Sequence, residues 1–198
     1  CLVPLLMDFA QGFPEIQLDI SFSDRAANLV DEGFDLAVRI GKPSDSSLIA
    51  RKLCDARVVV VAASKYPDER GTPTNPSELV DHDCIIDSNF PDPSRWRFAQ
   101  AEKEASIVSV AGRLRFSSAE ACLSAALRGF GVAYVPSFVA GPSIRDGAVH
   151  HLLRDWEDSP RAVYALYPPA RHLASKVRVL VDFLANSFRG EPEWDRGW

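Results

Sequence analysis

The sequence predicts an α/β fold built from two compact units, and three observations lead to that prediction. Helical and strand patterns alternate from the first residues onward. The run Val58–Ala63 is apolar on both faces, as expected for a central strand covered by helices on both sides. After Ser64 the chain changes to short elements separated by prolines, which indicates a second unit with its own βαβ core. We therefore expect a largely parallel sheet.

The first part of the chain supplies helix and strand signals in turn. Apolar residues on one helical stripe predict a helix over Leu2–Phe13, and strict apolar–polar alternation predicts a strand over Gln17–Phe22. Ser23 or Asp24 is expected to cap a short helix that runs to Asp31. The elements expected next are a strand at Phe34–Ile40, a loop at Gly41–Asp45, and strands at Leu48–Cys54 and Arg57–Ala63.

The remaining elements follow from the same patterns. Ser117 and Ser118 precede an Ala-rich helix, Ala119–Arg128, that Gly129 ends with a turn requiring positive φ. The clearest helix is His172–Phe188, and the charged segment Arg189–Trp198 is expected to be frayed. The other expected elements are a helical turn at Pro76–Val80, strands at Trp96–Ala99, Ser106–Phe116 (interrupted near Gly112), Gly131–Val135, Val149–Leu153 and Val163–Tyr167, and a helix opened by Pro136.

Composition excludes several functional classes. The 198 residues carry a net charge of −5, which argues against nucleic-acid binding by this part of the protein. The longest apolar run is far shorter than the roughly 20 residues that cross a bilayer. Cys1, Cys54, Cys84 and Cys122 have no metal-ligand spacing and are expected to be small buried side chains in a reducing cytoplasm. The motifs of the common enzyme classes are absent from the sequence, so we predict no catalytic residue, metal or cofactor.

Two places combine a strand end, hydroxyl side chains and a helix start, namely Ser23-Asp24 and Ser117-Ser118. Free amides and the positive end of the helix dipole suit such sites to a carboxylate or another anion, although plain helix capping explains each motif alone. Arg39 is a charge within an apolar strand, so it either pairs with Asp35 or Asp24 or faces a ligand. For the aromatic rings of Trp96 and Phe138 the alternatives are core packing and a place in a ligand pocket. Solvent contact or packing is enough to explain the pair His150-His151 without a functional role.

The order and spacing of several segments give the chain a specific resemblance to a known family. It resembles the effector-binding domain of LysR-type transcriptional regulators over nearly its whole length. The segments that carry the resemblance are Phe13–Asp19, Glu32–Gly41, Gly71-Thr72-Pro73 with Pro76, Leu79–Cys84, Gly129–Pro136, Arg171-His172-Leu173, Lys176-Val177-Arg178 and Val181–Leu184.

The resemblance implies a periplasmic-binding-protein-like fold (type 2) of two α/β subdomains joined by two crossover strands, with an effector in the cleft. Subdomain I would comprise residues 1–62 and 164–198, and subdomain II residues 63–163. The family's helix-turn-helix, linker helix and first strand are expected to lie outside this sequence. With Arg39 and Phe138 added from their chemistry, the predicted ligand-binding residues are Ser23, Asp24, Arg39, Gly41, Ser117, Ser118, Val135, Pro136 and Phe138.

The implied function is that of a cytoplasmic sensor for a small, anionic effector. It would form a homodimer or tetramer, contact DNA only through the helix-turn-helix domain, and have no membrane partner. The alternative is an exported solute-binding protein of the same two-lobed fold, which would have a signal peptide where the regulator has its DNA-binding domain. An enzyme on this scaffold would need a nucleophile or an acid–base pair in the cleft, and the sequence offers none.

Overall fold

The computed structural model describes residues 2–23, 29, 31–41, 47–66, 71–100, 104–169 and 175–198. By their contacts the residues divide into two units. Unit 1 comprises the chain up to Ala56 together with Arg161–Glu193, and unit 2 comprises Arg57–Pro160 together with Trp194–Trp198. The chain therefore passes between the units at three points, whereas the sequence led us to expect two, at residues 62 and 163. The additional passage places Trp194–Trp198 in unit 2.

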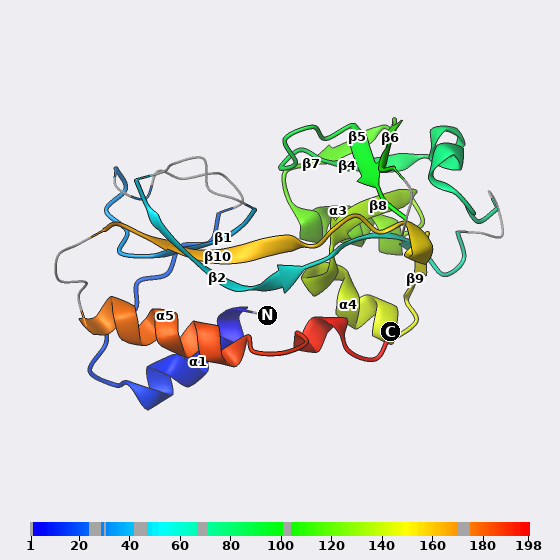
Figure 1. The fold of residues 1–198 in the computed structure, drawn as a ribbon. Coiled ribbons are helices and arrows are strands. Elements are labelled where there is room, and N and C mark those ends of the chain that lie inside the picture. The colour runs from blue at the N-terminus through cyan, green and yellow to red at the C-terminus, as the bar shows by residue number, and fades with distance from the viewer. Residues whose placement is uncertain are drawn as a thin grey trace. The chain divides into compact units, whose positions relative to one another are not determined.

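Among its described residues, unit 1 contains a three-stranded antiparallel sheet and two helices (Figure 1). The strand order is β1-β10-β2, and β10 pairs with both neighbours, with a register shift between Val163 and Tyr164. The helices α1 and α5 contact each other, and the rings of Phe9 and Phe183 meet edge to face with centroids 5.3 Å apart. The elements of unit 1 are α1 (Leu2–Gly12), β1 (Ala37–Ile40), β2 (Ile49–Ala56), β10 (Arg161–Tyr167) and α5 (Ser175–Ser187).

The predicted strand Gln17–Phe22 is wrong, because this segment pairs with none of the described strands and has no strand structure. Its apolar residues Ile20 and Phe22 are 39% and 65% exposed, so alternation alone did not supply the neighbour that a strand requires. The short helix expected to run from Ser23 or Asp24 to Asp31 lies mostly outside the described residues.

Unit 2 contains a five-stranded mixed sheet in the order β7-β4-β8-β3-β9. Its strands β4, β7 and β8 run parallel to one another, whereas β3 is antiparallel to both β8 and β9. The expected largely parallel sheet is therefore wrong for the described strands of unit 1, whereas in unit 2 β4, β7, β8 and β9 run in one direction and β3 opposes them. The strands of this sheet are β3 (Val58–Ala63), β4 (Cys84–Asp87), β7 (Leu114–Phe116), β8 (Val132–Pro136) and β9 (Val149–Leu152).

The two faces of this sheet pack against different layers. Alternate residues of β3 point to opposite sides, so Val59 and Val61 join one core and Val58 and Val60 join the other. The helices α3 (Ala119–Leu127) and α4 (Ser137–Arg145) cover the first face. The second face is covered by the paired strands β5 (Arg95–Phe98) and β6 (Ser106–Ser109) together with the 3₁₀ helix η1 (Pro76–Asp81). All six residues of β3 are buried as predicted, but of the two faces only the first is covered by the described α-helices.

Two glycines of unit 2 have conformational roles, one at a close backbone approach and one at a turn with positive φ. A Cβ at Gly112 would lie 1.6 Å from the carbonyl oxygen of Cys84, which explains why the predicted strand Ser106–Phe116 breaks there into β6 and β7. Gly129 has the positive φ expected at the end of α3, at 79°. Gly112, between β6 and β7, thus allows the close approach to the backbone of Cys84, and Gly129 allows the turn that ends α3.

The predicted frayed end is wrong. The side chains of Trp194 and Asp195 in η3 (Glu193–Asp195) are buried, at 8% and 7% exposed. The prediction rested on charge and on glycine and proline content, and it ignored the two tryptophans that pack in unit 2.

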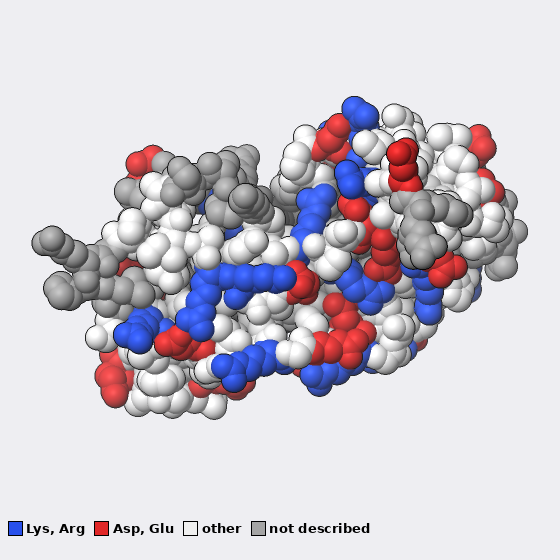
Figure 2. Space-filling model, in the orientation of Figure 1, with Lys and Arg blue, Asp and Glu red and all other residues white. Residues whose placement is uncertain are grey.

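On the face drawn in Figure 2, basic and acidic side chains lie interspersed over the described residues. Cys54, Cys84 and Cys122 are buried, as predicted, and none of them forms a disulfide with another described residue. None of the described helices is long and apolar enough to cross a membrane.

Candidate functional site

The carboxyl ends of the three parallel strands meet at one edge of the sheet in unit 2. In the β4–β7 register Asp87 lies opposite Phe116, and β8 runs parallel to β4 on its other side. The residues that follow these strands are therefore brought together, since parallel strands end at the same edge. In open α/β sheets this edge is where ligands bind. Of the predicted ligand-binding residues, those brought to this edge are Ser117, Ser118, Val135, Pro136 and Phe138.

Ser118 begins helix α3 at this edge. Its backbone is extended (φ −154°, ψ 127°), and its Oγ accepts a hydrogen bond from the amide of Ala121 at 3.4 Å. The same hydroxyl donates to a carboxylate oxygen of Glu120 at 3.0 Å. Ser118 is thus a helix cap, and the amides of the first helical turn at Ala119 and Glu120 have no intrahelical acceptor. These two amides can therefore donate hydrogen bonds to a ligand, at a helix end whose positive dipole attracts negative charge.

Helix α4 begins directly after β8 at the same edge. The amide of Ser137 donates to the carbonyl oxygen of Arg57 at 2.8 Å, which fixes the start of the helix against the start of β3. The side chain of Ser137 is fully buried, and its Oγ has no hydrogen-bond partner among the described residues. Pro136 and Phe138, on either side of it, are half-buried. Val135 is different, because its fully buried side chain belongs to the core under α3 and α4.

The sequence analysis missed the polar residues that follow β4. Asp87 is buried at 5% exposure, and the amide of Asn89 donates to its carboxylate at 2.9 Å. Ser88 donates through both its amide (2.8 Å) and its hydroxyl (3.0 Å) to the carbonyl oxygen of Phe116. These contacts join the ends of β4 and β7. The signal was present, since Cys84–Asp87 is a short apolar strand followed by Ser88-Asn89, but it is hidden among prolines.

The other predicted ligand-binding residues belong to unit 1. Ser23 is exposed, and Asp24 lies outside the described residues. Arg39 is half-buried in β1, opposite Tyr164 of β10, and Gly41 ends that strand with a φ of 88° and donates to the carbonyl oxygen of Ala162 at 2.8 Å. Asp35, one of the carboxylates considered as a partner for Arg39, pairs with Lys176 at 2.8 Å. Ligand contact by these residues remains a prediction.

The two buried thiols of unit 2, Cys84 and Cys122, are not reactive groups. Burial, with a smaller contribution from the negative charge of Asp83, raises the pKa of Cys84 to about 12. Burial, followed by the charge of Asp87, raises the pKa of Cys122 to about 12 as well. Both thiols therefore stay protonated at neutral pH, and a thiol rather than a thiolate is a weak nucleophile and a weak metal ligand. The described residues contain no group of three or more His, Cys, Asp or Glu side chains that could hold a metal ion.

Two α/β units, one of which gathers hydroxyls, helix starts and half-buried rings at the carboxyl edge of its parallel strands, define a small-molecule-binding domain. The LysR substrate binding domain matches residues 1–189, and the chain belongs to this family. Its fold is the type 2 periplasmic-binding-like fold of regulatory domains in LysR-type regulators.

Known relatives and solved structures agree with this membership. The chain is 34% identical over 184 residues to the HTH-type transcriptional regulator PtxR of Pseudomonas aeruginosa, covering 93% of this chain and 59% of that protein. The CrgA regulatory domain of Neisseria meningitidis has a TM-score of 0.84 and 29% identity, with 94% of this chain and 91% of that one covered. The full-length Vibrio cholerae virulence activator AphB has a TM-score of 0.82 and 28% identity, with 94% and 63% covered.

The names of the relatives indicate the kind of protein to which they belong. They are transcriptional regulators rather than enzymes. The chain spans about 60% of the length of the curated relatives that it matches first.

Proposed function

We propose that this chain senses a small anionic effector and thereby controls DNA binding by a LysR-type regulator. The observation that carries the proposal is the carboxyl edge of β4, β7 and β8, where the starts of α3 and α4 meet. Helix starts present amide donors and a positive dipole end, so a carboxylate is the ligand chemistry they favour. The family match favours this function over an exported solute-binding protein.

Each part of the edge has a role in the proposed binding. The hydroxyl of Ser117, which is exposed, and the first amides of α3 would bind the anionic group. The half-buried ring of Phe138 and the pyrrolidine of Pro136 would contact the apolar part of the effector. Val135 would support them from the core, because its own side chain is buried.

Buried Ser137 and Asp87 would limit which acids fit. The unpaired hydroxyl of Ser137 offers a donor to a ligand group that reaches it, whereas the carboxylate of Asp87 repels a second negative charge. A monocarboxylate with an apolar body is therefore the effector class that we propose. Ser23, Asp24, Arg39 and Gly41 remain predicted ligand contacts from unit 1.

The full-length protein would use this domain as a switch. We propose that it contacts DNA through an N-terminal helix-turn-helix domain, acts in the cytoplasm as a homodimer or tetramer, and shifts between conformational states when the effector binds. The greater length of the curated relatives, which are HTH-type regulators, supports this proposal.

A thermal-shift screen with benzoate, salicylate and short aliphatic monocarboxylates tests the site. A ligand present at 100 times its Kd stabilises the folded state by about 2.7 kcal/mol. For a domain of this size that corresponds to a rise in Tm of roughly 5–10 °C.

The variant Ser118→Asp gives the sharpest comparison. Asp caps helices as well as Ser does, so the Tm without ligand should change little, but its charge should abolish the shift caused by the acid. Ser109→Asp, on an exposed position of β6, is the control with the same added charge and should keep the full shift. A full shift in Ser118→Asp would place the effector elsewhere.

A further inference from the structure

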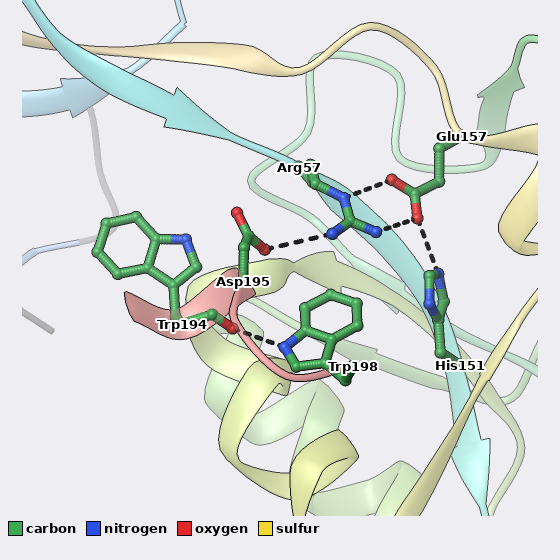
Figure 3. Close-up of polar contacts among 6 residues, drawn as sticks. All are labelled: Arg57, His151, Glu157, Trp194, Asp195 and Trp198. Atoms are coloured by element: carbon green, nitrogen blue, oxygen red, sulfur yellow. Dashed lines mark hydrogen bonds and ion pairs between the residues drawn. The ribbon is translucent and has the colours of Figure 1, made fainter. Parts of the chain in front are cut away.

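A group of charged side chains lies in unit 2 outside the candidate site. Arg57 donates from Nε and Nη2 to the two carboxylate oxygens of Glu157, at 2.7 and 2.6 Å (Figure 3). His151 Nε2 lies 3.0 Å from the same carboxylate and is almost fully buried. A bidentate pair of this kind fixes the guanidinium plane, because two parallel hydrogen bonds leave it little freedom.

Electrostatics favour the charged form of Glu157 in this position. Burial alone raises the pKa of the carboxyl group, but the hydrogen bonds from Arg57 and His151 outweigh that effect and lower the pKa to about 2. Glu157 therefore stays ionised at neutral pH and holds Arg57 in place.

The segment Trp194–Trp198, which we call the strap, packs on the other side of Arg57. The guanidinium lies over the indole ring of Trp198 at 4.6 Å from its centroid, and its Nη1 lies 3.7 Å from Asp195 Oδ1 (Figure 3). The same indole meets the ring of His151 edge to face at 5.2 Å. Arg57 is thus bound to Glu157 in the body of unit 2 and to two residues of the strap.

Helix α4 provides the surface beneath the strap. The ring of Trp194 meets that of Phe138 at 6.1 Å, and Trp198 Nε1 donates to the carbonyl oxygen of Trp194 at 2.7 Å, which closes the strap into a turn. A Cβ at Gly141 would lie only 2.2 Å from that carbonyl oxygen. The strap therefore approaches the helix backbone more closely than any residue other than glycine would allow.

The strap is attached to the rest of the chain by a short connection. Helix α5 of unit 1 ends at Ser187, so only residues 188–193 separate that helix from Trp194. The family match ends at residue 189, before the strap begins. The strap thus lies outside the residues that the family model matches.

We propose that the strap is a releasable conformational device, held on unit 2 by Arg57 and by the close approach at Gly141. In the docked state it covers Arg57 and this part of α4, and in the released state unit 2 stays folded with those residues uncovered. Among the described residues Trp194 belongs to neither hydrophobic core of unit 2, and Trp198 packs, only partly buried, against the core under α3 and α4. Release should therefore cost less free energy than unfolding.

Native-state hydrogen exchange of the full chain, read by mass spectrometry, tests this proposal with two independent variants. Gly141→Ala adds a methyl group against the strap and leaves every charge in place. Arg57→Lys keeps the charge but removes the bidentate bond and the planar stacking on Trp198. Arg95→Lys is the matched control, because Arg95 is exposed and its side chain pairs with its exposed neighbour Asp92.

Both test variants should accelerate exchange of the amides in residues 191–198 at least about tenfold, with the control unchanged. Exchange in β3 should stay within about twofold of the wild-type rate in all proteins. Unchanged exchange of the strap in Gly141→Ala would overturn the proposal. Equal acceleration in β3 would also overturn it, because the strap would then be part of one cooperative unit. If Arg57→Lys does not fold, Gly141→Ala still decides the question.

Discussion

Replacing Glu157 with Gln should remove a pH-dependent part of the stability of unit 2. The pKa of Glu157 is about 2, against an ordinary value of 4.5. A carboxyl group whose pKa is lowered by folding stabilises the folded state fully above its unfolded pKa. That stabilisation is lost as the pH falls from about 5 towards about 2.

The size of the effect follows from the difference in pKa. A difference of about 2.5 pKa units corresponds to about 3.4 kcal/mol at neutral pH, at about 1.36 kcal/mol per unit. Of this amount, the linkage relation removes about 1.4 kcal/mol between pH 6 and pH 3.5. The side chain of Glu157 is 19% exposed, so some screening applies and we expect about 1 kcal/mol.

Urea unfolding followed by tryptophan fluorescence measures this directly, since all four tryptophans lie in unit 2. Wild type should lose about 1 kcal/mol more than Glu157→Gln between pH 6 and pH 3.5, at unchanged m-value. Asp92→Asn, which removes an exposed ion pair with Arg95, is the control and should keep the wild-type slope to within about 0.5 kcal/mol. A constant difference between wild type and Glu157→Gln across this pH range would refute the assignment of Glu157 as an ionised, hydrogen-bonded anchor.

Two further predictions use matched pairs of positions and thermal or urea unfolding. Gly112→Ala should destabilise unit 2 by about 3 kcal/mol or more, because its Cβ would meet the backbone carbonyl of Cys84, whereas Gly12→Ala, with open space around it, should be within about 1 kcal/mol of wild type. Leu79→Ala should cost about 2–5 kcal/mol because Leu79 is fully buried, whereas Val80→Ala, at a position 60% exposed, should cost less than about 1 kcal/mol; equal losses within either pair would contradict the packing described here.

The sequence predicted those elements whose signal is local. Helix α3 begins and ends where its serine cap and glycine turn predict, and β3 is buried along its whole length. The direction of the strands could not be predicted in this way, because pairing depends on residues far apart in the chain. The alternating segment Gln17–Phe22 shows the same limit, since its pattern fits a strand but no described strand lies beside it.

Only those residues of the candidate site that have a local sequence signal could be predicted. Ser117 and Ser118 stand beside a recognisable helix start, so their place at the carboxyl edge could be predicted from the sequence around them. Asp87 and Ser137 could not, because each becomes notable only through burial, and burial is a property of the packed structure. The motif also could not separate capping from ligand binding, and the structure shows that Ser118 does cap its helix.

The first turn of α4 links the candidate site to the strap. Phe138 is a predicted ligand contact, and its ring also meets Trp194 of the strap. The amide of Ser137, its neighbour, is bound to the backbone of Arg57, whose side chain holds Trp198 and Glu157. The predicted ligand contact and the strap therefore share Phe138, and its neighbour Ser137 is hydrogen-bonded to Arg57. Closely packed groups of this kind move between discrete arrangements rather than deforming gradually. We therefore expect the free energy of effector binding at the carboxyl edge to depend on whether the strap is docked, and the free energy of strap docking to depend on whether the effector is bound.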